Sequence, residues 1–207
     1  MDFKIVKPTE ENLKKAAKFL KNEGVLVSPT ETVYGLIADA FCKPAVEKIF
    51  KIKNRPMNKA LICNISSYEM LYRLTDCDDF LFKKMTKLFW PGPLTIVVKK
   101  KPHILEYVTG KREDVAIRFS NCDILKKLTS FCDSPLVVPS ANISGEKSSS
   151  SFDDVYYSLK DVVDFFIDGG ECEFKKESTI VAIKNNGYEI LRQGAITKQE
   201  LEEKLKV

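Results

Sequence analysis

The sequence predicts an α/β protein in which helices flank a mixed β-sheet. Apolar residues at helical spacing alternate along the chain with short, β-branched runs, which is typical of this class. Residues 179–183 and 188–191 flank Asn185-Asn186-Gly187, a turn signal that predicts an antiparallel hairpin. Because no repeat, heptad or linker interrupts the alternation, we expect a single domain over residues 1–207.

Strands and helices can be assigned in order through the N-terminal half. Residues 3–6 alternate like a short strand, and Gly24 ends a first helix marked by Leu13, Ala16, Ala17 and Leu20. Residues 25–27 form an apolar strand that Ser28 and Pro29 stop. The remaining elements expected here are a helix around 46–50 with Pro44 near its start, a strand at 60–65, helices at 68–74 and 80–89, and a β-branched strand at 94–98 after Trp90-Pro91-Gly92-Pro93.

The C-terminal half continues the same alternation. We expect strands at 115–119, 136–138 and 162–167, separated by helices around 124–128 and 152–159 and by a serine-rich loop at 140–151. After the hairpin, Thr197 and Glu200 form a capping box that begins a last short helix.

Composition excludes several classes of protein. Hydrophobic residues make up 44% and charged residues 30% of the chain, which suits a core with a soluble surface. The N-terminal sequence MDFKIVKPTEEN is too polar for a signal peptide and no run is long enough for a membrane span, so we expect a cytoplasmic location. The six cysteines form no C-x-x-C pair and His103 is the only histidine, which argues against a metal site of the protein's own and against a Ser-His-Asp triad. The net charge of +4 allows an anionic ligand but is too small to indicate a nucleic-acid protein.

The stretch VLVSPTETVYGL is the candidate centre of function. Thr30, Glu31, Thr32 and Tyr34 place two hydroxyls, a carboxylate and a phenol directly after a predicted strand. Open α/β sheets place their ligand sites at such strand ends. The alternative is an ordinary connection from a strand to a helix with capping threonines.

Cationic and polar side chains at the ends of other elements suit a polyphosphate ligand. Neither a P-loop nor a Rossmann fingerprint is present. Taken singly, the cations could be a solvated helix end or structural salt bridges, and the loop PSANISG an ordinary serine turn. Taken together they match phosphate oxygens, which arginine binds with two parallel hydrogen bonds. These residues are Lys53, Arg55, Lys59, Arg118, Arg192, Ser140 and Asn142.

Seven blocks in order give the chain a family resemblance. PTETVYGL, KIKNRP, FWPGPLT, VAIR, PSANISG, STIVAI and LRQGAI together resemble the YrdC-like family of threonylcarbamoyl-adenylate synthases over nearly the whole chain. The resemblance implies a twisted open mixed sheet with flanking helices and a deep, positively lined cleft. It implies a nucleotidyltransferase that makes L-threonylcarbamoyladenylate and pyrophosphate from L-threonine, bicarbonate or CO2, and ATP with Mg2+. A downstream transferase would then pass the threonylcarbamoyl group to certain tRNAs, and weak tRNA binding is compatible with this role.

The same resemblance implies roles for single residues. It places Thr32, Asn64, Arg118 and Ser178 at the substrate threonine. Lys53, Arg55, Ser140 and Asn142 match the K-x-R and S-x-N pairs that face the phosphates and act in catalysis. The implied nucleotide contacts are Arg55, Lys59, Ser140, Asn142, Ser148 and Arg192.

The sequence departs from the family pattern at a few positions. Asn64 stands where some relatives have histidine, Pro139 replaces a common threonine, and Phe119-Ser120 replaces the usual residue and proline after the strand arginine. None of these changes removes a charge that the chemistry needs. We expect the single-domain form, without the extra C-terminal domain of longer relatives.

Two other functions are considered. An RNA-binding module would show exposed aromatic residues interleaved with lysine and arginine, whereas Phe50, Phe89, Phe165 and Phe166 lie in apolar runs. A carbamoyl-transfer domain of the hydrogenase-maturation type normally belongs to a longer chain with zinc-binding cysteine pairs, and such pairs are missing here.

Overall fold

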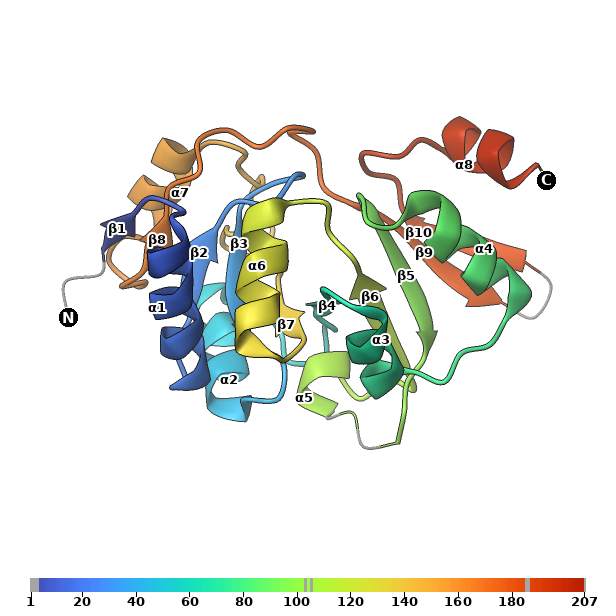
Figure 1. Cartoon of the computed structure of the whole chain (residues 1–207), viewed down its shortest axis with the longest axis horizontal. Helices are drawn as coiled ribbons and strands as arrows, with labels where there is room; N and C mark the ends of the chain where they lie inside the picture. The colour runs from blue at the N-terminus through green and yellow to red at the C-terminus, as the bar shows by residue number, and fades with distance from the viewer. Residues whose placement is uncertain (1–3, 103, 105, 185–186, 207) are drawn as a thin grey trace.

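One twisted, mixed sheet runs the length of the molecule (Figure 1). The computed structural model describes residues 4–102, 104, 106–184 and 187–206, and within them the strand order is β1-β8-β2-β3-β7-β4-β6-β5-β9-β10. Parallel and antiparallel pairs both occur, which confirms the predicted class. The strands are β1 (Ile5–Val6), β2 (Leu26–Ser28), β3 (Gly35–Asp39), β4 (Ile62–Asn64), β5 (Leu94–Lys99), β6 (Asp114–Arg118), β7 (Leu136–Val137), β8 (Phe166–Ile167), β9 (Thr179–Lys184) and β10 (Gly187–Arg192).

Four of the helices, α1, α3, α4 and α8, begin where a short polar side chain accepts from free backbone N–H groups. Thr9, Ser67 and Asp79 accept from the first turns of α1, α3 and α4, and the predicted capping box of Thr197 and Glu200 is present at α8. The helices are α1 (Glu10–Lys21), α2 (Lys43–Ile52), α3 (Tyr68–Leu74), α4 (Phe80–Phe89), α5 (Glu106–Thr109), α6 (Asp123–Cys132), α7 (Phe152–Leu159) and α8 (Lys198–Leu205). No helix in the described part of the chain is long and apolar enough to cross a membrane.

The two faces of the sheet are covered by different sets of helices. α1 and α6 lie side by side against β2, β3 and β7 (Figure 1) and bury Leu20, Ile37 and Leu128 with them. On the opposite face, α2 and α7 cover one half and α3, α4 and α8 the other. This larger core takes alternate residues of the strands β4, β6, β5 and β9, namely Cys63, Ile117, Ile96 and Val181.

The residues between those core positions face the other way. Ile62 on β4, Val97 on β5, Ala116 on β6 and Ile180 on β9 line a cleft. On β6 the alternation places Val115 and Ile117 on the core face and Ala116 and Arg118 on the cleft face. Strand alternation therefore gives four neighbouring strands one core face and one ligand-accessible face.

The stretch after Pro29 leads to a strand, which the sequence analysis missed. Residues 35–39 form β3, which pairs antiparallel with β2, so the polar loop joins two strands and not a strand to a helix. The run Leu36-Ile37-Ala38 is buried on both faces, and a run this short shows no periodicity that separates strand from helix. Gly35 permits the loop 139–141 to approach, because a Cβ there would lie 2.5 Å from a methyl carbon of Val138.

Other differences concern element ends. The strand expected at 162–167 is reduced to β8, the strand expected at 60–65 to β4, and α5 was not predicted. Phe3, Asn185 and Asn186 fall outside the described residues, but β9 and β10 on either side of the predicted turn pair antiparallel, with Gly187 opposite Lys184. That pairing confirms the hairpin.

We predict that Gly194→Ala destabilises the cleft wall. A Cβ at this position would lie 2.2 Å from the carbonyl oxygen of Glu177 and 2.4 Å from the carbonyl carbon of Ser178, both of them backbone atoms. Overpacking of this kind costs about 1–3 kcal/mol, and urea unfolding measures the loss. The comparison variant is Gly170→Ala, where a Cβ meets nothing but φ is +79°, so only backbone strain of about 1 kcal/mol is expected. Equal effects at both positions would show that the contact with residues 177–178 is not the cause.

Candidate active site

A cleft of about 390 Å³ opens over β4, β6, β5 and β9 on the face that points away from the larger core. Its walls come from the β2–β3 loop, the segment after α2, the loop 138–140 and the segment 177–180. The charged residues that line it in the described part of the chain are Arg55, Lys59, Arg112, Arg118, Arg192 and Glu177. The excess of cations agrees with the expected positively lined cleft and suits an anionic ligand.

Internal hydrogen bonds fold the β2–β3 loop into a fixed turn. The hydroxyl of Thr30 accepts from the backbone N–H groups of Thr32 and Val33 at 3.1 and 3.2 Å and donates to the carbonyl of Val33 at 2.7 Å. Its oxygen also lies 2.8 Å from Oγ1 of Thr32. The capping role considered for these threonines is thus replaced by a turn that aims Thr32 into the cleft.

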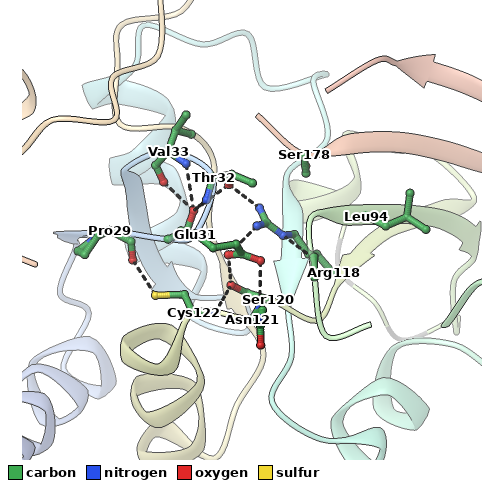
Figure 2. Close-up of polar contacts among 12 residues, drawn as sticks. Pro29, Glu31, Thr32, Val33, Leu94, Arg118, Ser120, Asn121, Cys122 and Ser178 are labelled. Carbon is green, nitrogen blue, oxygen red and sulfur yellow. Dashed lines mark hydrogen bonds and ion pairs between the residues drawn. The ribbon is translucent and has the colours of Figure 1, made fainter. Parts of the chain in front are cut away.

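Arg118 reaches this loop from the end of β6 (Figure 2). Its Nη1 donates to Oγ1 of Thr32 at 2.9 Å, its Nε donates to the carbonyl of Gly92 at 3.3 Å, and its Nη2 lies 2.7 Å from Oε2 of Glu31. The residue is 5% exposed, yet it lines the cleft. Arg118 therefore forms a structural ion pair and, in the same position, faces the cleft where a ligand can bind.

Glu31 is held on several sides (Figure 2). Its Oε2 accepts from the hydroxyl of Ser120, and its Oε1 accepts from the backbone N–H of Asn121 at 2.8 Å. Burial alone raises the pKa of Glu31, but the charge of Arg118 and the hydrogen bonds from Ser120 and Asn121 outweigh burial and hold the pKa below its usual value. Glu31 is therefore a carboxylate at neutral pH.

Two buried polar atoms near this ion pair lack an aligned hydrogen bond among the described residues. They are Nη2 of Arg118, which nevertheless lies 2.7 Å from Oε2 of Glu31 in an ion pair, and Oδ1 of Asn64. Asn64 is 1% exposed and pairs in register with Arg118 across β4 and β6, so both side chains leave the same face of the sheet. A guanidinium next to a buried acceptor without a partner is complementary to an amino acid, which carries a carboxylate and an ammonium group.

The other cations line the cleft with weaker partners. Arg55 donates to the carbonyl of Ala60 at 2.9 Å, and burial together with the charge of Arg192 lowers its pKa. Arg192 donates to the carbonyl of Ser178 at 2.9 Å and lies 2.6 Å from Oε2 of Glu177. In the described part of the cleft lining, Arg55, Lys59 and Arg192 face a single carboxylate, that of Glu177, so an excess of positive charge remains to attract anions.

Lys53 and Asn142 lie behind the cleft wall and do not line it. The ammonium group of Lys53 donates to the carbonyl of Ser140 and, at 2.6 Å, to that of Asn142, while burial and the charge of Arg55 lower its pKa to about 8. The solvated helix end considered for Lys53 is excluded, because this residue is 2% exposed. In this arrangement Lys53 fixes the loop that presents Ser140 to the cleft.

The expected site residues thus fall into two groups. Those that line the cleft are Thr32, Arg55, Lys59, Arg118, Ser140, Ser178 and Arg192. Those that do not are Lys53, Asn64, Asn142 and Ser148.

Two charged residues of the cleft lining, Arg112 and Glu177, were not expected from the sequence, and two residues of the candidate stretch, Glu31 and Tyr34, make contacts that the sequence did not specify. Arg112 and Glu177 line the cleft, Glu31 holds Arg118, and Tyr34 donates to the carbonyl of Gly170 at 2.7 Å and so ties the β2–β3 loop to the segment after β8. Arg112 stands in a loop, where no periodicity marks a residue as inward or outward. An ion pair of Glu31 could have been inferred from the sequence, because a carboxylate between two threonines at a strand end needs a partner if it is buried.

The cleft offers few ligands for a metal ion. No group of three His, Cys, Asp or Glu side chains in the described residues could hold one, and Glu177, the carboxylate in the lining, is already paired with Arg192. His103 lies outside the described residues. The donor set therefore does not match a magnesium site made by the protein alone.

A family model described as "Telomere recombination", for Sua5, YciO and YrdC proteins, matches residues 18–194. The chain belongs to this family. The resemblance seen in the sequence blocks is confirmed.

The chain is similar to curated proteins of the family. It is 36% identical over 193 residues to the threonylcarbamoyl-AMP synthase of Pyrococcus abyssi, which covers 93% of this chain and 57% of the relative. It is 36% identical over 202 residues to a putative threonylcarbamoyl-AMP synthase of Methanocaldococcus jannaschii, which covers 96% of this chain and 95% of the relative. The chain thus spans somewhat over half of the first relative and nearly all of the second.

The fold is also found in solved structures. That of P. abyssi Sua5 complexed with L-threonine matches with a TM-score of 0.92 and 35% identity, over 97% of this chain and 59% of that chain. The E. coli YciO structure matches with a TM-score of 0.82 at 21% identity, which shows a shared fold alone.

We predict that the contribution of Glu31 to stability disappears in acid. A carboxylate whose pKa is lowered by folding stabilises the protein above its unfolded pKa near 4.5, and this stabilisation is lost as the pH falls through the lower folded value. At pH 7, Glu31→Gln should lower the free energy of unfolding by about 3–5 kcal/mol, because it leaves Arg118 buried without a counter-charge. Urea unfolding from pH 7 to pH 3 should show the two proteins converging below about pH 4.5. A difference that stays constant with pH would show that the charge of Glu31 is not what stabilises the fold.

Proposed function

We propose that the protein is an L-threonylcarbamoyladenylate synthase, a nucleotidyltransferase that joins L-threonine, bicarbonate or CO2, and ATP and releases pyrophosphate. The observation that carries the proposal is one cleft that combines a buried arginine, Arg118, with further cations. Arg118 lines the cleft beside its register partner Asn64, whose Oδ1 has no hydrogen-bond partner among the described residues, and Arg55, Lys59 and Arg192 line the same cleft. The names of the relatives from P. abyssi and M. jannaschii support the same activity.

The threonine end is proposed to bind the amino acid by all its polar groups. The guanidinium of Arg118 takes the carboxylate, and Oδ1 of Asn64 accepts from the ammonium group. The hydroxyl side of the amino acid lies toward Thr32 and Ser178, whose hydroxyls both line the cleft. The P. abyssi structure with bound L-threonine supports an amino-acid ligand for this fold.

The cationic end is proposed to bind ATP. Arg55, Lys59 and Arg192 contact the phosphates, together with Ser140 from the loop that Lys53 and Asn142 hold in place. Ser148 extends the same loop and is partly buried. These side chains stabilise the charge that develops on the phosphoryl oxygens.

The reaction then follows from position and electrostatics. The amino group of threonine, once it has lost a proton, attacks CO2 and releases a second proton, or attacks bicarbonate and releases water, to give a carbamate. A carbamate oxygen then attacks the α-phosphorus of ATP. The bond from the α-phosphorus to the departing pyrophosphate breaks, and the cations of the cleft stabilise the negative charge on the leaving group. No covalent intermediate with the protein is required, which agrees with a cleft lined by cations and hydroxyls.

Mg2+ is proposed to enter with ATP. Because the cleft supplies no carboxylate cluster, the ion would be held by the phosphates and by water. The steps assigned above to the protein's own residues do not depend on it.

The cellular setting is part of the same proposal. The product would be handed in the cytoplasm to a separate transferase that modifies tRNA, with at most weak tRNA binding by this chain. Phe50, Phe89, Phe165 and Phe166 are buried in the cores, so they do not offer the stacking platforms of an RNA-binding module.

The first functional prediction concerns substrate dependence. Purified protein should release pyrophosphate from ATP only when L-threonine and bicarbonate are both present. L-Serine should support a rate roughly tenfold lower, because loss of one methyl group from a fitted pocket costs about 1–3 kcal/mol. Coupled detection of pyrophosphate, with omission of each component as the control, measures both. Release that does not depend on threonine would contradict the synthase assignment.

The second functional prediction separates the two ends of the cleft. Arg118→Lys keeps the charge but loses the planar fork, so threonine binding should weaken by roughly tenfold or more while ATP binding changes little. Arg55→Ala is the matched variant at the other end, and it should weaken ATP binding and leave threonine binding nearly unchanged. Calorimetric titration of threonine and of ATP into each variant measures both dissociation constants. Equal losses for both ligands in Arg118→Lys would assign that residue a structural role alone.

A further inference from the structure

We propose that Glu31 and Ser120 are positioning residues that make Arg118 selective for the carboxylate of an amino acid and against phosphate. The inference rests on the proposed function, since it assumes that Arg118 binds threonine while its neighbours bind ATP. Neither Glu31 nor Ser120 lines the cleft, so both act through Arg118.

Contacts from three sides hold the guanidinium of Arg118 in one orientation. Arginine has five N–H donors in a fixed plane, and three protein oxygens engage Arg118 from different sides: the hydroxyl of Thr32, the carbonyl of Gly92 and the carboxylate of Glu31. Three contacts around a planar group leave it no rotation. The N–H donors of the guanidinium that these three oxygens do not engage therefore keep a fixed position and remain available to a ligand.

Ser120 and Asn121 keep Glu31 in place. The hydroxyl of Ser120 and the backbone N–H of Asn121 both donate to the carboxylate, so Glu31 cannot turn away when a ligand approaches. The side chains of Arg118 and Glu31 are only 7% and 4% exposed. Such a pair is shielded from water and is not replaced by a dissolved anion.

The pairing of Arg192 provides the contrast. Its ion pair with Glu177 is about one-third exposed on each side, at 35% and 32%, and no other residue in the described part of the chain holds the Glu177 carboxylate. Phosphate can displace an exposed partner of this kind. Among the described residues, the hydrogen bonds of Arg55 go to backbone carbonyls, those of Lys59 and Ala60.

The consequence is a difference in charge between the two ends. Arg118 with Glu31 is a neutral pair, which matches an amino acid of zero net charge. A phosphate with two negative charges near Glu31 is repelled by a carboxylate that cannot move. Without Glu31, Arg118 would be one more bare cation in a cleft that must also hold a triphosphate, and pyrophosphate could occupy the threonine end.

The decisive experiment is steady-state kinetics of Glu31→Gln with pyrophosphate as the probe. In the wild type, pyrophosphate should compete with ATP and not with threonine. In Glu31→Gln, the KM for threonine should rise roughly ten- to a hundredfold, the KM for ATP should stay within about twofold, and pyrophosphate should now also compete with threonine. A merely structural role would lower kcat or the amount of folded protein without creating this new competition.

Two further variants keep the proposal open to refutation. Glu177→Gln makes the same change of charge beside Arg192, and it should alter the KM for ATP without letting pyrophosphate compete with threonine. Ser120→Ala keeps both charges and removes one hydrogen-bond donor to Glu31. It replaces Glu31→Gln as the test variant if Glu31→Gln does not fold. In Ser120→Ala the KM for threonine should rise severalfold. If folded Glu31→Gln and Ser120→Ala both keep the wild-type KM for threonine, the positioning role is wrong and the synthase assignment stands. If wild-type turnover itself ignores threonine, the proposed function is wrong.

Discussion

The buried ion pair between Arg118 and Glu31 is the interaction on which the rest of the site depends. It joins the loop after β2 to the end of β6, two segments far apart in the sequence, and places Thr32 in the same contact. A buried pair of charges contributes little net stability when it forms but costs several kcal/mol when one partner is removed. Its function here is to fix geometry. The turn made by Thr30, the hydrogen bond from Ser120 and the strand alternation of β6 all position this single contact.

The cleft as a whole combines two kinds of electrostatic environment. One end holds an arginine with a permanent counter-charge, and the other holds cations whose partners are carbonyl oxygens or an exposed carboxylate. A synthase that must keep an amino acid and a triphosphate apart, yet close enough to react, needs such a difference. The fold supplies it because one sheet face carries both ends, on neighbouring strands.

Sequence patterns predicted the parts of the structure that depend on local chemistry. The capping box at Thr197, the hairpin strands and the two faces of β6 follow from periodicity and from short-range hydrogen bonding, and they were found. The strand β3 was missed because Leu36, Ile37 and Ala38 are buried on both faces and show no alternation. The burial of Lys53 against the loop 140–142 was missed for a different reason, since its partners are backbone carbonyls that carry no sequence signal. The ordered family blocks, in contrast, identified most of the residues that line the cleft.

A crystal structure of the protein with bound L-threonine tests the central claim most directly. We predict that the threonine carboxylate lies within hydrogen-bond distance of Arg118 while the contact between Arg118 and Glu31 remains in place, and that Arg55, Lys59 and Arg192 stay free for ATP. An amino acid bound at the cationic end, or an Arg118 side chain that has turned away from Glu31 to meet its ligand, would contradict the account.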